Sequence, residues 1–512
     1  MRLGIDFGTT HTVVAAADRG NYPAVSFQTE AGDMQSWYPS LIGVHGGEIA
    51  FGLEAQARLG ETGWSFLRSF KRLLGGLAPD AQVVVGSQSL PALELLVQYL
   101  RHLRQALIGK SNLKIRADAP LAAMIAIPAN ANSNQRFLTL EAFRQAGFRV
   151  LGMINEPSAA GIEYAHNHIR NEWTSRKQYL VVYDLGGGTF DASIISLADN
   201  LYEVMTDEGI SRLGGDDIDE RLLALALEHA SIKREIGASE RYHLLEECRR
   251  QKEGLHPNTR KIVIDLSRGI EGGGTVIVSV EELYASCTPL IEETIAAVES
   301  AVSRLRHKMD LSWSEIETIY LVGGSSDLPL VGRMLRERYG RRVRRSPYPH
   351  SATAIGLAIA SDETAAAKVL KERFTRHFGV WREADSGRRM VFDSIFAKDT
   401  LLPGPKDPPL AETRSYRPAH NAAHFRYLEC SRLTADGQPA GDIMPWDEIF
   451  FPVDPGLRAE SDPAAAVVRR TDEVAGQTIE ELYSCDSHGV IEATIADKTT
   501  GYEQKYRLRK KK

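Results

Sequence analysis

The sequence predicts an α/β protein with two similar lobes, followed by a small all-β domain. The first observation is a repeated motif, in which an aspartate, an apolar residue and a glycine turn ending in threonine lie between two strand-like runs: LGIDFGTTHTVVAAAD and YLVVYDLGGGTFDASIISL. The second is that such strands alternate with amphipathic helices over roughly the first 362 residues, which favours a mixed sheet with crossovers. The third is a change, beyond that point, to proline-rich loops and short alternating runs.

The repeat indicates two lobes because its two copies lie far apart in the chain, much further than the period of a solenoid. Helices are predicted between the strands. Leucines and a valine from Leu93 to Leu107 recur at spacings of three and four, which marks one helical face. Ser133 is expected to cap a helix that runs to about Gly147. Apolar positions predict a long helix near 280–308, and a third glycine turn follows a strand at IYLVGGSSDLP, before the small-residue helix ATAIGLAIA.

The last part of the chain predicts a β domain. The segment AAAKVLKERFTRH is a connector, and the proline-rich loop LLPGPKDPPL follows it. Ile491, Ala493 and Ile495 alternate with Glu492 and Thr494, the pattern of a half-buried strand. Turns are expected on both sides of this strand, at 486–489 and 498–501.

Composition excludes several classes of protein. The 512 residues, 43% hydrophobic and 25% charged, suit a soluble globular protein of about three domains. A net charge of −6 argues against nucleic-acid binding, so the runs Arg341–Arg345 and Lys510–Lys512 are interpreted as a solvated loop and tail. The sequence contains no run of about 18 apolar residues, so no transmembrane helix is expected. Its N-terminus lacks the pattern of a signal peptide, so export is not expected either. Four well-separated cysteines favour a reducing cytoplasm, with no disulfide framework or zinc site.

The two glycine-threonine turns predict a polyphosphate site. Glycine lets the backbone approach a phosphate closely, and successive N–H groups in such a turn form an anion-binding concavity. Asp6 and Asp184 would face the phosphates as anions, which requires a cation between them. Mg²⁺ suits this position because it keeps several waters and takes only one or two carboxylates. One such turn alone is weak evidence; the matched pair is strong.

In order along the chain, these motifs resemble those of the 70-kDa heat-shock (DnaK-type) chaperone family. Besides the two hairpins, INEPSAAGI and VGGSS resemble its connecting and adenosine elements, SFKRLLGG its catalytic-lysine segment, and IPANANSNQR its proline-arginine switch. The segments HFGVWREADSGRRMVFDSIFAKDTLLP and DSHGVIEATIADKTTG resemble strands of its peptide-binding sandwich. The resemblance implies an actin-like (ribonuclease H-like) ATPase domain over 1–362, with lobes of about 1–175 and 176–362. A connector over 363–376 and a β-sandwich over 377–512 without a helical lid would follow.

The resemblance also implies roles for single residues. Lys71 would contact the γ-phosphate or the attacking water, and Glu156 would orient water or magnesium. Asp6 and Asp184 would hold the metal through water, and Pro128 and Arg136 would relay nucleotide state to the β domain. The implied catalytic residues are Lys71, Glu156, Asp184, Thr189 and Asp191. The implied nucleotide contacts are Asp6, Gly8, Thr9, Thr10, His11, Gly186, Gly187, Gly188, Gly214, Gly215, Lys252, Glu253, His256, Gly323, Gly324, Ser325 and Asp327.

The adenine side departs from the family pattern. Lys252 is kept in CRRQKEGLH, but Arg249 replaces an acidic residue, and Glu253 and His256 replace an arginine and a serine. Asp327 stands where the family has a second arginine, and His350 replaces an aspartate. Because both arginines that would stack on adenine are missing, we expect weaker nucleotide binding or an altered base preference. The connector also lacks the family's acidic, leucine-rich signature, which docks as a strand.

The leading hypothesis is a slow, ATP-dependent chaperone that binds unfolded or extended client peptides, with ATP/ADP and Mg²⁺ as its ligands. The resemblance also admits K⁺, a J-domain co-chaperone and a nucleotide exchange factor. Neither nucleic acid nor membrane is expected as a partner. One alternative is a nucleotide-dependent binding or regulatory module with little turnover. Another is an actin-like sugar kinase, which shares the two lobes and similar hairpins.

Overall fold

The computed structural model describes residues 1–129, 131–168, 179–197, 202–210, 212–362, 370–404, 407–459 and 467–507. The chain divides into two compact units. The first comprises residues 1–73, 82–130 and 141–370, and the second comprises 74–81, 131–140 and 371–512. The lobe boundary predicted near residue 175 and positions 363–369 of the predicted connector lie outside the described residues.

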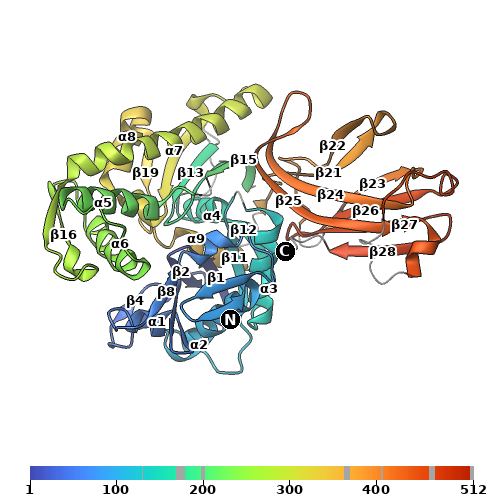
Figure 1. The fold of residues 1–512 in the computed structure, drawn as a ribbon. Coiled ribbons are helices and arrows are strands. Elements are labelled where there is room, and N and C mark those ends of the chain that lie inside the picture. The colour runs from blue at the N-terminus through green and yellow to red at the C-terminus, as the bar shows by residue number, and fades with distance from the viewer. Residues whose placement is uncertain are drawn as a thin grey trace. The chain divides into compact units, whose positions relative to one another are not determined.

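Two mixed sheets form the centre of the first unit (Figure 1). The first-lobe sheet has the order β12-β11-β1-β2-β5, with β1 (Arg2–Phe7), β2 (His11–Ala16), β5 (Tyr38–Pro39), β11 (Ala122–Ile127) and β12 (Arg149–Asn155). The second-lobe sheet has the order β19-β18-β13-β14-β15-β20, with β13 (Tyr179–Leu185), β14 (Phe190–Ser196), β15 (Tyr202–Ile210), β18 (Ile316–Val322), β19 (Val343–Arg345) and β20 (Leu370–Lys371).

The two sheets repeat one topology. Each is built on an antiparallel hairpin, β1–β2 in one lobe and β13–β14 in the other. In each, two further strands follow in parallel on the side of the first hairpin strand: β11 and β12 in the first lobe, β18 and β19 in the second. The predicted duplication of an α/β lobe is therefore present. In addition, β20 lies beside β15 as the sixth strand, so strand pairing at the connector persists without the expected signature.

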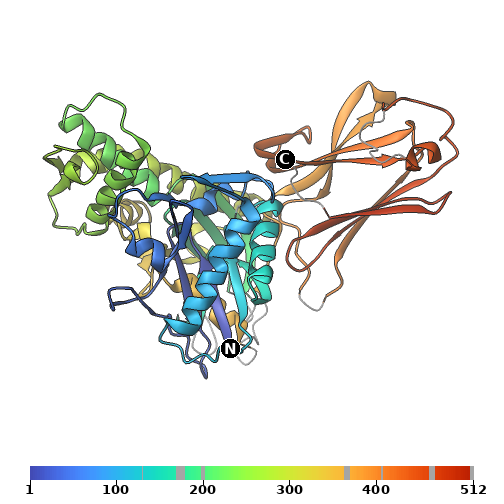
Figure 2. The same ribbon diagram turned by 60° about the horizontal axis from the view of Figure 1, so that its bottom comes forward.

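Two helices lie side by side between the sheets, α4 (Glu156–His168) and α9 (Ala352–Ser361) (Figure 1). Glycine makes this packing possible. A β-carbon at Gly4 of β1 would lie 2.2 Å from the Ala354 carbonyl oxygen, and one at Gly356 would lie 1.7 Å from that of Ala159. On the other face of the first sheet lies α2 (Ala92–Gly109) (Figure 2). The hydroxyl of its Tyr99 hydrogen-bonds that of Thr12 on β2 at 2.8 Å.

The remaining elements of the first unit surround these layers. In the first lobe they are β3 (Phe27–Gln28), β4 (Met34–Gln35), β6 (Leu41–His45), β7 (Glu48–Phe51), α1 (Leu53–Ala57), β8 (Ser65–Arg68), β9 (Gln82–Val85) and β10 (Gln88–Pro91). In the second they are α5 (Gly215–His229), α6 (Ala238–Glu253), β16 (Lys261–Asp265), β17 (Thr275–Ser279), α7 (Val280–Met309) and α8 (Pro329–Tyr339). The helices predicted at 93–107 and 280–308 are confirmed as α2 and α7.

Two local predictions were wrong. The helix α3 (Ser133–Gln145) is capped by Asn132, whose side-chain oxygen accepts a hydrogen bond from the Gln135 amide at 2.9 Å. Ser133 is the first helical residue, and its amide and hydroxyl both donate to the Glu429 carboxylate within the second unit. The run Arg341–Arg345 is likewise not a simple loop, because Val343–Arg345 forms the edge strand β19.

The second unit contains two four-stranded antiparallel sheets. Their strands are β21 (His377–Ala384), β22 (Arg389–Phe396), β24 (Ala422–Leu433) and β25 (Pro439–Pro452) in one, and β23 (Leu410–Tyr416), β26 (Ile479–Cys485), β27 (Ile491–Asp497) and β28 (Tyr502–Arg507) in the other. Side chains from both sheets share one hydrophobic core. Ile491, Ala493 and Ile495 are buried as predicted.

A charged network also links the two sheets of the second unit. Arg382 of β21 donates to both carboxylate oxygens of Glu481 on β26, at 3.0 and 2.7 Å, and to Asp393 on β22 at 2.6 Å. The Glu481 side chain is fully buried. Burial acts to raise the pKa of Asp393, but hydrogen bonds from Arg414 and Arg382 outweigh it and lower that pKa.

All four cysteines are buried and unpaired. None of the helices in the described part of the chain has both the length and the apolar character needed to cross a membrane.

Candidate active site

A cavity of about 1040 Å³ lies between the two lobes of the first unit. It is lined by residues from the turns of the two hairpins, Gly8–Thr10 after β1 and Gly186–Thr189 after β13. Residues of α6, the turn Gly323–Asp327, α8 and β19 line it as well. The turns that sequence analysis matched therefore face one space from opposite lobes.

The two turns approach each other closely. A β-carbon at Gly187 would lie 2.8 Å from Oγ1 of Thr10, and one at Gly188 would lie 2.7 Å from Cγ2 of Thr9. Glycine is required at these positions because there is no room for a side chain. The backbone itself does not require glycine, because neither residue has a positive φ. The threonine hydroxyls and the backbone amides of both turns are thus gathered together at the cavity, which suits a chain of phosphate oxygens.

A buried cluster of charge lies beside the turns. Lys71 on η1 (Phe70–Leu73) donates to Glu156, the first residue of α4, with 2.5 Å between Nζ and Oε1. Burial acts to lower the Lys71 pKa, but the carboxylates of Glu156 and Asp6 outweigh it and raise that pKa. Lys71 therefore stays a cation.

The carboxylates of this cluster outnumber its cation. Burial and repulsion from Glu156 raise the pKa of Asp6 to about 7, against the attraction of Lys71. Burial, together with Glu156, Asp6 and Asp191, also raises the pKa of Asp184 well above its usual value. Four carboxylates around one ammonium group leave a site that attracts a further cation. Among the described residues, no three candidate ligands are placed to hold a metal ion directly.

Two further glycine segments support the second hairpin. Gly214 and Gly215 lie at the start of α5, and the amide of Gly215 donates to the Gly186 carbonyl at 3.0 Å. Gly323 adopts a positive φ of 81°. A β-carbon there would lie 2.4 Å from the Asp184 carboxylate, so only glycine allows this turn to pack on β13.

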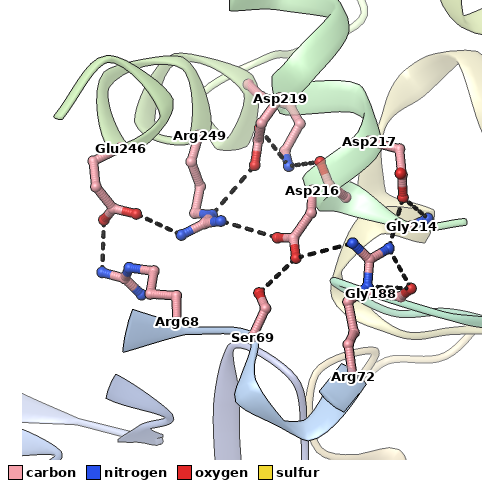
Figure 3. A network of polar contacts seen from close by, with 12 residues as sticks. Arg68, Ser69, Arg72, Gly188, Gly214, Asp216, Asp217, Asp219, Glu246 and Arg249 are labelled. Carbon is pink, nitrogen blue, oxygen red and sulfur yellow. Dashed lines mark hydrogen bonds and ion pairs between the residues drawn. The ribbon is translucent and has the colours of Figure 1, made fainter. Parts of the chain in front are cut away.

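A seam of ion pairs joins the lobes beside the cavity (Figure 3). Arg68 of the first lobe lies 2.6 Å from the Glu246 carboxylate on α6. Ser69 donates to Asp216 on α5 at 2.6 Å, and Arg72 contacts Asp217 at 2.8 Å. Arg72 also donates to the Gly188 carbonyl at 2.9 Å, so the seam reaches the second glycine-threonine turn itself.

Arg249 lies at the centre of this seam (Figure 3). Its guanidinium lies 2.6 Å from Glu246, 2.9 Å from Asp216 and 3.3 Å from the buried Asp219. Lys252, one turn further along α6, contacts Asp219 at 2.7 Å and donates to the Gly215 carbonyl at 2.8 Å. The arginine that replaces the expected acid is therefore used to bind other acidic residues.

The wall of the cavity formed by Gly323–Asp327, α8 and β19, here called the far wall, brings together two of the departures from the family pattern, Asp327 and His350. Asp327 lies 3.3 Å from the imidazole Nε2 of His350, although 23 residues separate them in the chain. The other carboxylate oxygen of Asp327 forms an ion pair with Arg345 on β19. His350 also packs on the glycine turn, because a β-carbon at Gly324 would lie 2.9 Å from its ring.

Most of the predicted site residues line this one cavity. They are Asp6, Gly8, Thr9, Thr10, His11, Lys71, Glu156, Asp184, Gly186, Gly187, Thr189, Gly215, Lys252, Glu253, His256, Gly323, Gly324, Ser325 and Asp327. Of the predicted residues in the described part of the chain, Gly188, Gly214 and Asp191 do not line it. Asp191 is buried behind the turn as the strand partner of Asp184, and Gly214 packs on the backbone of Gly187.

The predicted switch residues lie away from the cavity. Pro128 follows β11 in the first unit, whereas Arg136 groups with the second unit. Sequence analysis missed Arg345, although the run that contains it was noticed, because nothing in the run shows which arginine faces the cavity. It also missed the ion-pair seam, whose members come from separate segments.

Comparison with known proteins gives one consistent result. A family model described as "Hsp70 protein" matches residues 2–372. The chain is 29% identical over 375 residues to a "Chaperone protein HscA homolog" of Colwellia psychrerythraea, covering 71% of this chain and 58% of that protein. It is 30% identical over 373 residues to "Chaperone protein DnaK" of Mycoplasmopsis agalactiae (70% and 58%), and 31% identical over 391 residues to that of Thermotoga neapolitana (72% and 61%). The chain spans about three fifths of the length of the curated relatives it matches.

Proposed function

Since the chain belongs to the Hsp70 family, we propose that it is an ATP-dependent chaperone that hydrolyses ATP slowly in the cavity between its lobes. The observation that supports this best is the meeting of the two glycine-threonine turns, at which side chains of one lobe lie against backbone of the other. A site divided between lobes is completed only when they close. Nucleotide binding and lobe closure are then coupled.

In this proposal each polar group at the turns has a role. The amides and hydroxyls at Thr9, Thr10 and Thr189 bind phosphate oxygens. Lys71, held by Glu156, stabilises negative charge on the γ-phosphate and orients the attacking water. Asp6 and Asp184 hold hydrated Mg²⁺, which supplies charge neutralisation for the phosphates when it is bound.

We further propose that the two sheets of the second unit form a β-sandwich that binds extended peptide, with residues 1–362 as the nucleotide-binding domain and 363–376 as the connector. The relatives' names as chaperones and the strand-like segments of the sequence support this. Pro128 and Arg136 relay nucleotide state to that domain. A J-domain protein and a nucleotide exchange factor are its proposed partners.

The proposal predicts that ATP releases a bound peptide faster than ADP does. The test is the dissociation rate of a fluorescein-labelled unfolded peptide, followed by anisotropy after addition of Mg-ATP, Mg-ADP or buffer. Thr189→Ala, at the phosphate turn, should abolish the difference between ATP and buffer. Thr500→Ala, at an exposed turn of the second unit, is the control, because it leaves the two glycine-threonine turns unchanged. Equal peptide release under all three conditions would contradict coupling.

A second candidate is a nucleotide-dependent regulatory module with little turnover. It is favoured by the changed residues on the far wall, where Asp327 and His350 replace the residues expected there. The two candidates differ in hydrolysis and not in binding. Nucleotide binding without measurable phosphate release would support the regulatory module.

A further inference from the structure

We propose that Arg345 supplies the cationic face on which the nucleobase stacks, at a position fixed by Asp327 and His350. The inference rests on the proposed function, because it takes the ligand to be a nucleotide whose phosphates lie at the two glycine-threonine turns. It adds the residue that recognises the base. It also replaces the expectation that base stacking has been lost.

The phosphate turns determine where a base can lie. They line the cavity together with the turn Gly323–Asp327 and with Arg345 of β19. A nucleotide anchored by its phosphates at the turns extends its sugar and base into this space. Arg345, Asp327 and His350 all line it.

The guanidinium of Arg345 is held in a definite place. β19 is the edge strand beside β18, with Arg345 opposite Leu321, and this pairing fixes its backbone. The Asp327 carboxylate contacts one terminal nitrogen of Arg345, and its other oxygen faces His350. A carboxylate at the edge of a guanidinium leaves the flat faces open, and the Arg345 side chain is 48% exposed. Such a face stacks well on aromatic rings.

The other arginines of the cavity are less suited to this role. Arg249 is bound by three carboxylates, and its side chain is only 13% exposed. The guanidinium of Arg333 already lies over the ring of Tyr284, at 5.3 Å. Arg336 lies beside Gly332 on its own helix, with Nη1 3.5 Å from where a β-carbon of that glycine would be. Arg345 combines a fixed edge with an accessible face.

The charges on this wall are therefore rearranged rather than lost. The position after the glycine turn, where the family has an arginine, holds the acid Asp327. That acid now anchors an arginine from the neighbouring strand. The guanidinium of Arg345 therefore lies beside Asp327 on this wall, and the sequence alone did not show this because the two residues are joined through the β18–α8–β19 crossover.

The test compares two ligands that differ only in having a nucleoside, Mg-ATP and Mg-tripolyphosphate, by isothermal titration calorimetry. Arg345→Ala is expected to weaken ATP binding by about three- to tenfold and to leave tripolyphosphate binding unchanged. Arg345→Lys should behave like the alanine variant, because it keeps the charge and loses the flat face. Arg344→Ala is the matched control, since Arg344 is exposed on the same strand, lies 3.9 Å from Glu317 and does not line the cavity.

Three results would overturn the assignment: unchanged ATP affinity in Arg345→Ala, equal losses for ATP and tripolyphosphate, or full ATP affinity in Arg345→Lys. The failure of the proposed function is distinct. In that case the wild-type protein itself would bind neither ligand, and no variant would be needed to see it.

Discussion

Gly188 lies so close to Thr9 that a β-carbon at position 188 would be 2.7 Å from the threonine Cγ2. The two residues belong to the turns of different hairpins in different lobes. Their contact shows that the two copies of the repeated motif meet in the folded chain, where both line one cavity. It also leaves no room for a single methyl group between the lobes.

Gly188→Ala is therefore expected to separate the two turns. The new methyl group would also meet Nε of Arg72 at 2.7 Å, so overpacking of about 1–3 kcal/mol opposes closure. We expect Mg-ATP affinity to fall at least about fivefold, measured by titration calorimetry. Gly186→Ala is the comparison, because its β-carbon would meet only the Thr189 carbonyl oxygen, at 3.5 Å. Equal losses in the two variants would contradict a steric cause.

The ion-pair seam predicts a salt-dependent rate of nucleotide release. Arg68 connects the lobes through Glu246, so Arg68→Ala removes one restraint on opening. We expect release of a fluorescent ADP analogue to become about two- to tenfold faster in stopped-flow experiments at low salt. Because salt screens such charges, the difference from wild type should shrink at high salt. Arg234→Ala, which breaks the Arg234–Glu240 pair within the second lobe, should leave the rate unchanged. A similar acceleration in that control would disprove the role of the seam.

His11 predicts an acid-dependent loss of stability in the nucleotide-free protein. Burial, and then the nearby positive charges of Arg68 and Arg249, lower its pKa from 6.5 to about 3. Between these values the unfolded chain binds the extra proton, so the stability contributed by neutral His11 is complete above pH 6.5 and is lost as pH falls toward 3. This amounts to about 2 kcal/mol between pH 7 and pH 5.

The measurement for His11 is the free energy of unfolding in urea at pH 7 and pH 5. His11→Gln should reduce the difference between the two pH values by about 2 kcal/mol. His307→Gln, at an exposed position in the last turn of α7, should leave it unchanged. If the unfolding free energy changed by the same amount between pH 7 and pH 5 in His11→Gln as in wild type, the imidazole would not be kept neutral by its surroundings.

The buried ion pair of the second unit predicts a large effect from a small change. Glu481→Ala would leave Arg382 without its main partner between the sheets, at a cost of about 3–5 kcal/mol. We expect a lower midpoint of thermal unfolding. The measurement is the far-ultraviolet circular dichroism signal of the β-strands as the protein is heated. Glu480→Ala, on the same strand, removes the partner of Lys498 at 3.2 Å and should cost less than about 1 kcal/mol. Equal effects of the two substitutions would rule out a special role for the buried pair.

Sequence analysis identified the two glycine-threonine turns better than the wall that carries Asp327 and His350, for a physical reason. The turns Gly8–Thr10 and Gly186–Thr189 are local, so they could be identified from neighbouring residues. On that wall, the groups come from separate elements. Asp327 and His350 were each noticed as departures, but their contact depends on a strand crossover that no local pattern shows.

The same reason explains what was predicted of the fold. The helices α2 and α7 follow from the helical spacing of their apolar residues, and the two hairpins follow from strand-like runs on either side of a glycine turn. The pairing of Arg68 with Glu246 depends on how far the two lobes close, which no single segment determines. The cap of α3 was assigned to Ser133 instead of Asn132 because both residues are good caps, and the hydrogen bonds of Ser133 to Glu429 are long-range.

The central proposal is that ATP is hydrolysed where the two lobes meet, beside the buried cation Lys71. The direct test is single-turnover hydrolysis of radiolabelled ATP with Mg²⁺ and enzyme in excess at a concentration that saturates binding, for wild type, Lys71→Ala and the exposed-lysine control Lys114→Ala. We predict slow hydrolysis by wild type and the control, and a rate about a hundredfold or more lower in Lys71→Ala. A wild-type rate equal to that of Lys71→Ala would contradict the account.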